Sequence, residues 1–127
     1  MKLRTLILSM LVFCIGCSTY KNVSDDNLIG NFYGLAKGQI QGSNTQYNLE
    51  LKEDNVFILN INGHDFNPKC EGIWKRRADT LILKCSDNEG IAEKLSNGYM
   101  NQREFVIKVN NKNKLKLDNV TLKRKYK

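Results

Sequence analysis

The sequence is short of the residues that catalytic and metal-binding sites use most. Its 127 residues contain one histidine, one tryptophan and one proline. His64 alone cannot build a multi-histidine metal centre, and the glycines follow neither P-loop nor dinucleotide spacing. No serine lies in a G-x-S-x-G context, and His64 beside Asp65 is at most half of a nucleophile-activating relay. We therefore predict no catalytic residues, no metal and no cofactor.

Acidic residues are also few, with 13 Asp and Glu against 20 Lys and Arg, for a net charge of +7. The apolar content of 41% is globular, and the length suits one domain with one core. A basic chain favours acidic partners such as lipid headgroups or polyanions. An ordinary solvated basic surface is the alternative interpretation.

No apolar run is long enough to span a bilayer, which takes about 20 residues. The longest, from Leu6 to Ile15, follows the positive residues Lys2 and Arg4 and is broken only by Ser9. A charged start, a short apolar stretch and a small residue at its end are typical of a secretory signal. An uncleaved membrane anchor is the alternative.

The end of this segment, Cys14-Ile15-Gly16-Cys17, resembles a bacterial lipobox, although leucine is usual where Cys14 stands. The resemblance implies cleavage before Cys17 and a lipid on its thiol. The resemblance also implies a cell-envelope location, at the periplasmic or surface face of the outer membrane. Residues 18–29 are polar and lack a core pattern, which predicts a tether. The expected parts of the chain are a signal peptide (1–16), a lipidated cysteine with a polar tether (17–29) and a folded domain (30–127). An ordinary secretory signal remains the alternative.

Cys70 and Cys85 are the two cysteines left for an oxidising compartment, and an even remainder predicts a disulfide. They flank the turn 76–79. If Lys75 pairs with Thr80, Cys70 lies directly opposite Cys85, close to disulfide reach.

From residue 30 onward the apolar residues alternate with polar ones, as in half-buried strands. Pairing Lys52 with Val56 leaves the loop 53–55, with asparagine at the left-handed position. This register opposes Leu51 to Phe57, Leu49 to Leu59 and Tyr47 to Ile61. In the same way Val109 faces Leu115 across 111–113, and the turn 118–119 opposes Leu117 to Val120 and Leu115 to Leu122.

The pattern predicts an all-β fold, an antiparallel up-and-down meander of about eight strands that closes, or nearly closes, into a small barrel. A β-sandwich is the alternative. A helical turn is expected at 91–95. The strands are expected near 31–36, 46–52, 56–62, 70–75, 80–85, 103–109, 113–117 and 120–125. The inward side chains are expected to be Leu49, Leu59, Trp74, Leu81, Phe105, Ile107 and Leu115.

Three segments resemble small lipocalin-like, lipid-anchored barrels of bacterial envelopes. They are 30–34, starting Gly30-Asn-Phe32 where that family has tryptophan in place of Phe32; 72–83, with Trp74; and 117–124, ending at Arg124. The resemblance implies a barrel that carries a small apolar or amphipathic ligand.

We expect a lipid-anchored protein that acts by binding, without catalysis and without nucleic acid. Its partners would be the membrane, through Cys17, and a small apolar ligand or an envelope protein. Five residues are candidates for ligand contact, and a role in the core or in a turn is the alternative for them: Tyr33, Tyr47, Trp74, Arg76 and Arg77. The alternative is an inhibitor or immunity-type protein that binds through the loops 37–45, 63–69 and 86–102.

Overall fold

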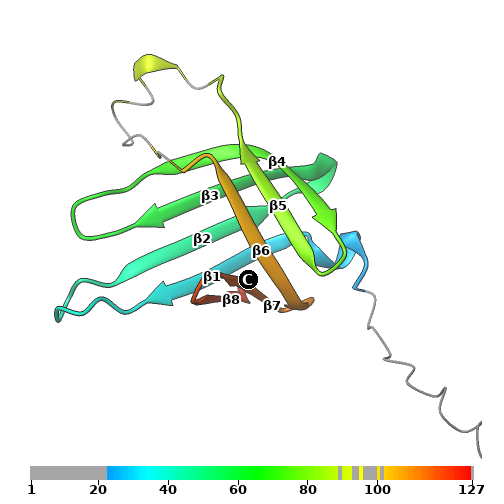
Figure 1. Cartoon of the computed structure of the whole chain (residues 1–127), viewed down its shortest axis with the longest axis horizontal. Coiled ribbons are helices and arrows are strands. Elements are labelled where there is room, and N and C mark those ends of the chain that lie inside the picture. Colours follow the sequence, from blue (N-terminus) through cyan, green and yellow to red (C-terminus); the bar gives the residue numbers. More distant parts are fainter. Residues whose placement is uncertain (1–22, 89, 93–94, 96–99, 101, 127) are drawn as a thin grey trace, which may run out of the picture.

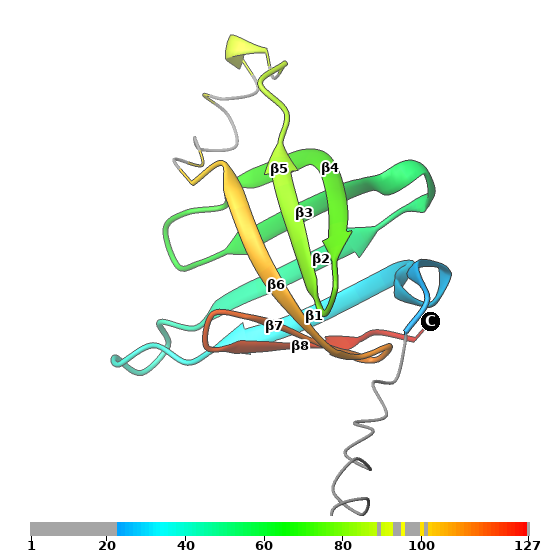
Figure 2. The ribbon, with the colours of Figure 1, turned by 45° about the vertical axis from the view of Figure 1, so that its right-hand side comes forward.

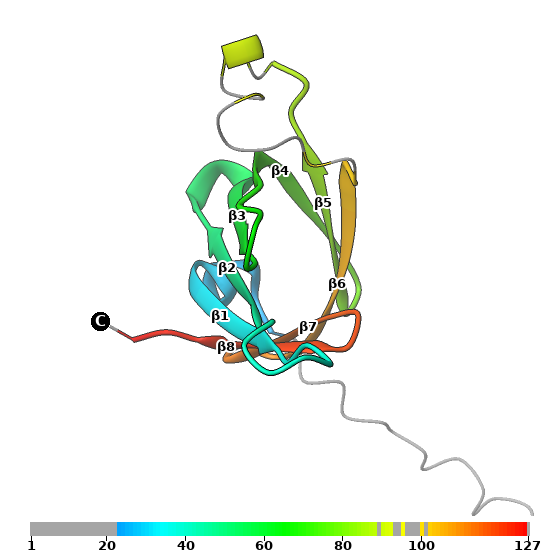
Figure 3. The same cartoon turned by 90° about the vertical axis from the view of Figure 1, so that its left-hand side faces the viewer.

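The computed structural model, which describes residues 23–88, 90–92, 95, 100 and 102–126, is a closed barrel of eight antiparallel strands. Each strand pairs with the next, and β1 pairs with β8 through Phe32–Arg124 and Tyr33–Lys123. Figure 3 shows the resulting ring of strands. The closed ring confirms the predicted meander barrel and excludes the sandwich. The strands are β1 (Gly30–Ala36), β2 (Thr45–Leu51), β3 (Val56–Asn62), β4 (Lys69–Arg77), β5 (Thr80–Cys85), β6 (Glu104–Asn111), β7 (Lys114–Leu117) and β8 (Val120–Arg124).

The segment before β1 belongs to the folded unit, whereas the sequence assigned it to the tether. A 3-10 helix, η1 (Asp25–Leu28), precedes β1; Leu28 is fully buried and Val23 packs against the core. The predicted signal peptide 1–16, Cys17 and the tether up to residue 22 lie outside the described residues. Residues 23–29 of the predicted tether thus pack on the barrel, through Leu28 and Val23.

The barrel interior is apolar, because every second residue of each strand points inward. All seven side chains predicted to face inward are buried, and among the described residues no polar or charged one is. Leu59, Leu81, Ile107 and Leu115 have no solvent exposure. Solvent therefore does not reach the middle of the barrel.

The β2–β3 hairpin has the predicted register, with Leu51 opposite Phe57 and Tyr47 opposite Ile61. Its loop forms a short 3-10 turn, η2 (Glu53–Asn55). Asn55 has a φ of 59° and Asp54 a φ of 62°, in the region that asparagine and aspartate tolerate best among residues with a side chain.

Replacing Asn55 with valine should lower the free energy of unfolding by about 1–2 kcal/mol, since a β-branched residue resists a positive φ. Asn55→Gly should be neutral within about 0.5 kcal/mol. Urea unfolding measures both. Asn48→Val, at an extended position of β2, is the control; an equal loss in the control would rule out backbone strain as the cause.

The predicted β4–β5 register is wrong by two residues. Arg77 pairs with Thr80, so the turn is Ala78-Asp79, and Cys85 lies opposite Gly72 instead of Cys70. A shift of two leaves the same side chains facing inward, so alternation could not detect it. The disulfide forms all the same, with a Cα–Cα distance of 5.7 Å between Cys70 and Cys85. Gly72 permits the close approach of the β4 and β5 backbones beside the disulfide, because a Cβ at residue 72 would overlap the Lys84 carbonyl oxygen.

The C-terminal hairpins agree with the prediction. Val109 faces Leu115, Leu117 faces Val120, and an irregularity after Val109 takes up the extra residue of the β6–β7 turn. In the expected helical turn 91–95, residues 91, 92 and 95 are helical and the other two lie outside the described residues.

Candidate functional site

The two ends of the barrel differ in construction. Because the strands run up and down, the loops 37–44 and 63–68 and the segment joining β5 to β6 all lie at one end, which we call the loop end. The short turns 52–55, 78–79 and 112–113 lie at the other, together with η1; we call this the closed end. Figure 1 shows the β1–β2 and β3–β4 loops on the left and η1 on the right. The long connecting segments are thus gathered at the loop end, where a ligand or partner can contact them.

Two arginines tie η1 and its flanking residues over the closed end. The Arg76 guanidinium donates to the Val23 carbonyl and lies 3.1 Å from an Asp25 carboxylate oxygen. Its Nε donates to the Ala78 carbonyl at 2.9 Å. The sequence suggested Arg76 as a candidate for ligand contact. In the structure its side chain is only 16% exposed and is held by these partners.

Arg124 holds the same segment from the last strand. Its guanidinium donates to the carbonyls of Asn27, Ile29 and Lys112, and it lies 4.7 Å from the centre of the Phe32 ring. The sequence did not identify Arg124 as a site residue, because the role of Arg124 depends on hydrogen bonds to backbone carbonyls that are far away in the sequence. Its role is structural, and with Arg76 it fixes η1 over the barrel interior at the closed end.

The loop end is apolar both inside and out. Inside, Tyr47 and Ile61 are half-buried against the core, and Met100 from the β5–β6 segment is buried there. Outside, each of the three connections carries at least one large apolar side chain that is more than half exposed: Ile40, Phe66, Ile91 and Leu95. Single exposed apolar residues are ordinary, but several at one end favour a contact surface.

The structure does not bring the five predicted contact residues together. Tyr47 faces the loop end, whereas Trp74 is buried near the closed end, 2% exposed, with its indole N–H 3.4 Å from the Lys52 carbonyl. Tyr33 and Arg77 lie on the outer face of the barrel. Of the five, Tyr47 alone is placed to contact a ligand at the loop end.

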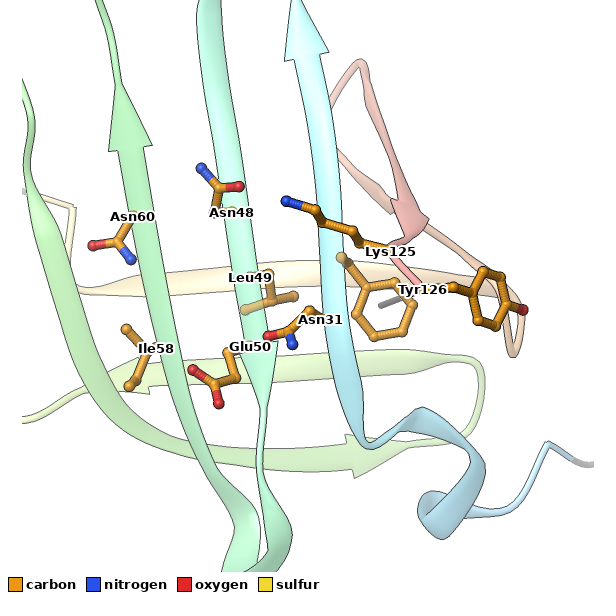
Figure 4. A pocket seen from close by; sticks show the side chains of 9 residues that line it. Asn31, Asn48, Leu49, Glu50, Ile58, Asn60, Lys125 and Tyr126 are labelled. Carbon is orange, nitrogen blue, oxygen red and sulfur yellow. The ribbon is translucent and has the colours of Figure 1, made fainter.

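Two hollows lie away from the loop end. One, of about 300 Å³, runs over the outer face of β1–β3 beside the C-terminal residues (Figure 4). Its walls are amides, one carboxylate and a few apolar groups: Asn31, Phe32, Asn48, Leu49, Glu50, Ile58, Asn60, Lys125 and Tyr126. The other, of about 370 Å³, lies between η1 and η2 and includes Asp25, Asp26, Glu53 and Asp54.

No histidine or cysteine lines either hollow. Within the part of the chain that the structure describes, no three histidine, cysteine, aspartate or glutamate side chains are arranged to hold a metal ion. His64 lies 3.8 Å from Asp65, and both side chains are almost fully in water. Nothing orients or desolvates this pair, so it lacks the surroundings that activate a catalytic base.

Two of the segments that resemble lipocalin-like barrels meet in space, since Arg124 of the last covers Phe32 of the first. None of the helical segments described in the structure is both long and apolar enough to cross a membrane. No protein-family model, no curated protein and no solved structure matches this chain.

Proposed function

We propose that this protein is a lipid-anchored binding protein of the bacterial outer membrane, and that it does not catalyse a reaction. The anchor is the lipid expected on Cys17, as the lipobox-like segment 14–17 suggests. The ligand is small and apolar or amphipathic. It binds at the loop end, where Tyr47 and Ile61 form the inner wall and the loop residues Ile40 and Phe66 form the rim.

This proposal rests on the difference between the closed end and the loop end of a barrel whose interior is apolar. The closed end is occupied by η1 and two arginines, and the middle is filled by side chains without solvent exposure. The loop end alone combines half-buried apolar walls with exposed apolar tips. An apolar ligand there gains by covering surface that is now in water.

Fatty-acid labelling in cells tests the anchor. A clickable palmitate analogue should label the wild-type chain and the Cys14→Ser variant, because Cys14 leaves with the signal peptide. The Cys17→Ser variant should carry no label. The denatured mass of the protein from its native envelope should correspond to a chain starting at Cys17 plus acyl groups. Label on the Cys17→Ser variant would contradict the anchor.

Native mass spectra of the same material test the ligand. Wild-type protein should carry a small-molecule adduct, and Ile40→Ser with Phe66→Ser should lower its occupancy by at least about tenfold, since each removes a large apolar contact. The matched control is Ile73→Ser with Val106→Ser, two exposed apolar residues on the outer faces of β4 and β6. Equal loss in both pairs would argue against the loop end.

A protein partner is the second candidate, and the exposed apolar loop residues favour it as well. Protein interfaces concentrate their binding energy in a few such side chains. If the native spectrum shows an empty barrel, crosslinked pull-downs from the envelope should recover a partner with wild type and with the Ile73/Val106 control, and lose it with Ile40→Ser and Phe66→Ser. Recovery by all three proteins would contradict this function.

A further inference from the structure

Many lysines lie on the outer face of β6–β8 and on the residues that flank these strands. Because these strands alternate, their outward positions lie side by side, and two lysine pairs are directly opposed: Lys108 with Lys116, and Lys114 with Lys123. Like charges in directly opposed positions are destabilising. Six residues, all exposed, form what we call the lysine face: Lys108, Lys112, Lys114, Lys116, Lys123 and Lys125.

Among the described residues, no ion pair involves a lysine of this face. The ion pairs there are His64–Asp65, Arg76–Asp25 and Arg103–Asp87. The other cross-strand neighbours of Lys108, Lys116 and Lys123 are the uncharged residues Thr80, Thr121 and Tyr33. The charge of the face is therefore available to an external anion.

The lysine face adjoins the place where the N-terminal segment joins the barrel. Arg124 bridges the carbonyls of Lys112 and Asn27, and the Lys125 N–H donates to the Asn31 carbonyl at 2.8 Å. Figure 2 shows the end of β8 beside η1. Cys17 lies six positions before Val23, and an extended chain of that length spans at most about 20 Å. A lipid on Cys17 would hold this side of the barrel within that distance of the bilayer.

We propose that the lysine face binds the anionic headgroups of the membrane that anchors the protein, an inference that rests on the proposed lipid on Cys17. Charge complementarity and the short tether both favour this partner. At physiological ionic strength the attraction extends about 8 Å, so the face must come close to the headgroups. Each lysine near an anionic surface contributes about fivefold to the affinity. A barrel held in this way is oriented, with the outer face of β6–β8 towards the bilayer.

Vesicle sedimentation of the full chain carrying Cys17→Ser tests the face without the lipid. Binding to phosphatidylcholine vesicles with equal phosphatidylglycerol should exceed binding to pure phosphatidylcholine, and 0.5 M salt should remove the difference. Lys108→Gln, Lys116→Gln and Lys123→Gln together should weaken anionic-vesicle binding about 100-fold. The matched control replaces three lysines away from the face, Lys52, Lys75 and Lys84, with glutamine and should lose less than about threefold.

Two results would overturn the proposal. An equal loss in the two triple variants would mean that net charge, and not the face, is responsible. Soluble heparin binding with no preference for anionic vesicles would point to a polysaccharide instead. Failure of the anchor is seen separately, as missing acyl label on Cys17, because the vesicle assay uses a chain without it. Unchanged circular dichroism spectra and melting of the variants would show that they fold.

Discussion

Replacing Cys70 and Cys85 together with alanine is expected to lower the free energy of unfolding by about 3 kcal/mol. The bridge joins residues with a sequence separation of 15. In the chain-entropy model, a crosslink over a loop of that size restricts the unfolded chain and raises its free energy by about 3 kcal/mol. For a domain of this size the melting temperature should fall by about 10–20 °C. Alanine suits the site, because both cysteines are buried in apolar surroundings.

Reductant provides the control for the disulfide. Thermal unfolding of the wild type, followed by circular dichroism, should shift downward when a phosphine reductant is added to the denatured protein before refolding. The double alanine variant should melt at the same temperature with and without reductant. A wild-type melting temperature that reductant leaves unchanged would mean that the bridge contributes nothing to stability.

Arg124→Ala should cost about 2–4 kcal/mol of unfolding free energy. The guanidinium donates to three backbone carbonyls and covers the Phe32 ring. The part-buried bond to the Ile29 carbonyl contributes about 1.5–3 kcal/mol, and the exposed bonds to Asn27 and Lys112 contribute less, because water can replace them. Loss of the side chain frees η1 from β8. Urea unfolding measures the cost, and hydrogen exchange should show faster exchange at Asn27, whose amide bonds to the Ser24 carbonyl.

Two further substitutions, at Arg124 itself and at Lys123, separate the effect of the hydrogen bonds from the effect of the charge. Arg124→Lys keeps the charge but has a single amino group, so it should recover less than half of the loss. Lys123→Ala, next to it on the outer face, should change stability by less than about 0.5 kcal/mol. If Arg124→Lys matches the wild type, charge alone holds η1 and the fork of bonds is unimportant.

The hairpins could be predicted wherever the apolar pattern and the turn residues agree. The β2–β3 register followed from alternating leucines on both sides of a loop ending in asparagine, and the structure has the same pairs. The β4–β5 register could not be found in this way, because a shift of two residues preserves the alternation. The alternation of apolar residues carries no information about the tertiary contact of Arg76 with Val23 and Asp25, because these two residues lie in a segment far away in the chain.

Candidate contact residues were harder to predict than strands, for a related reason. Trp74 and Tyr47 both point inward, but only the order of the strands and the direction of each one decide which end of the barrel a side chain lies near. Tyr33 was chosen for its aromatic ring, although the parity of β1, with Phe32 buried, places it outside. Residue type suggests chemistry, and topology decides whether residues share a site.

The pairing of the first strand with the last also bears on the order of folding. Seven of the eight strand pairs join neighbours in the sequence, whereas β1 and β8 lie at the two ends of the folded segment. Bringing these two strands together closes the longest loop in the barrel and costs the most chain entropy. We therefore expect the β1–β8 seam to form last. Until it forms, β1 and β8 each have an unpaired edge that another chain can join.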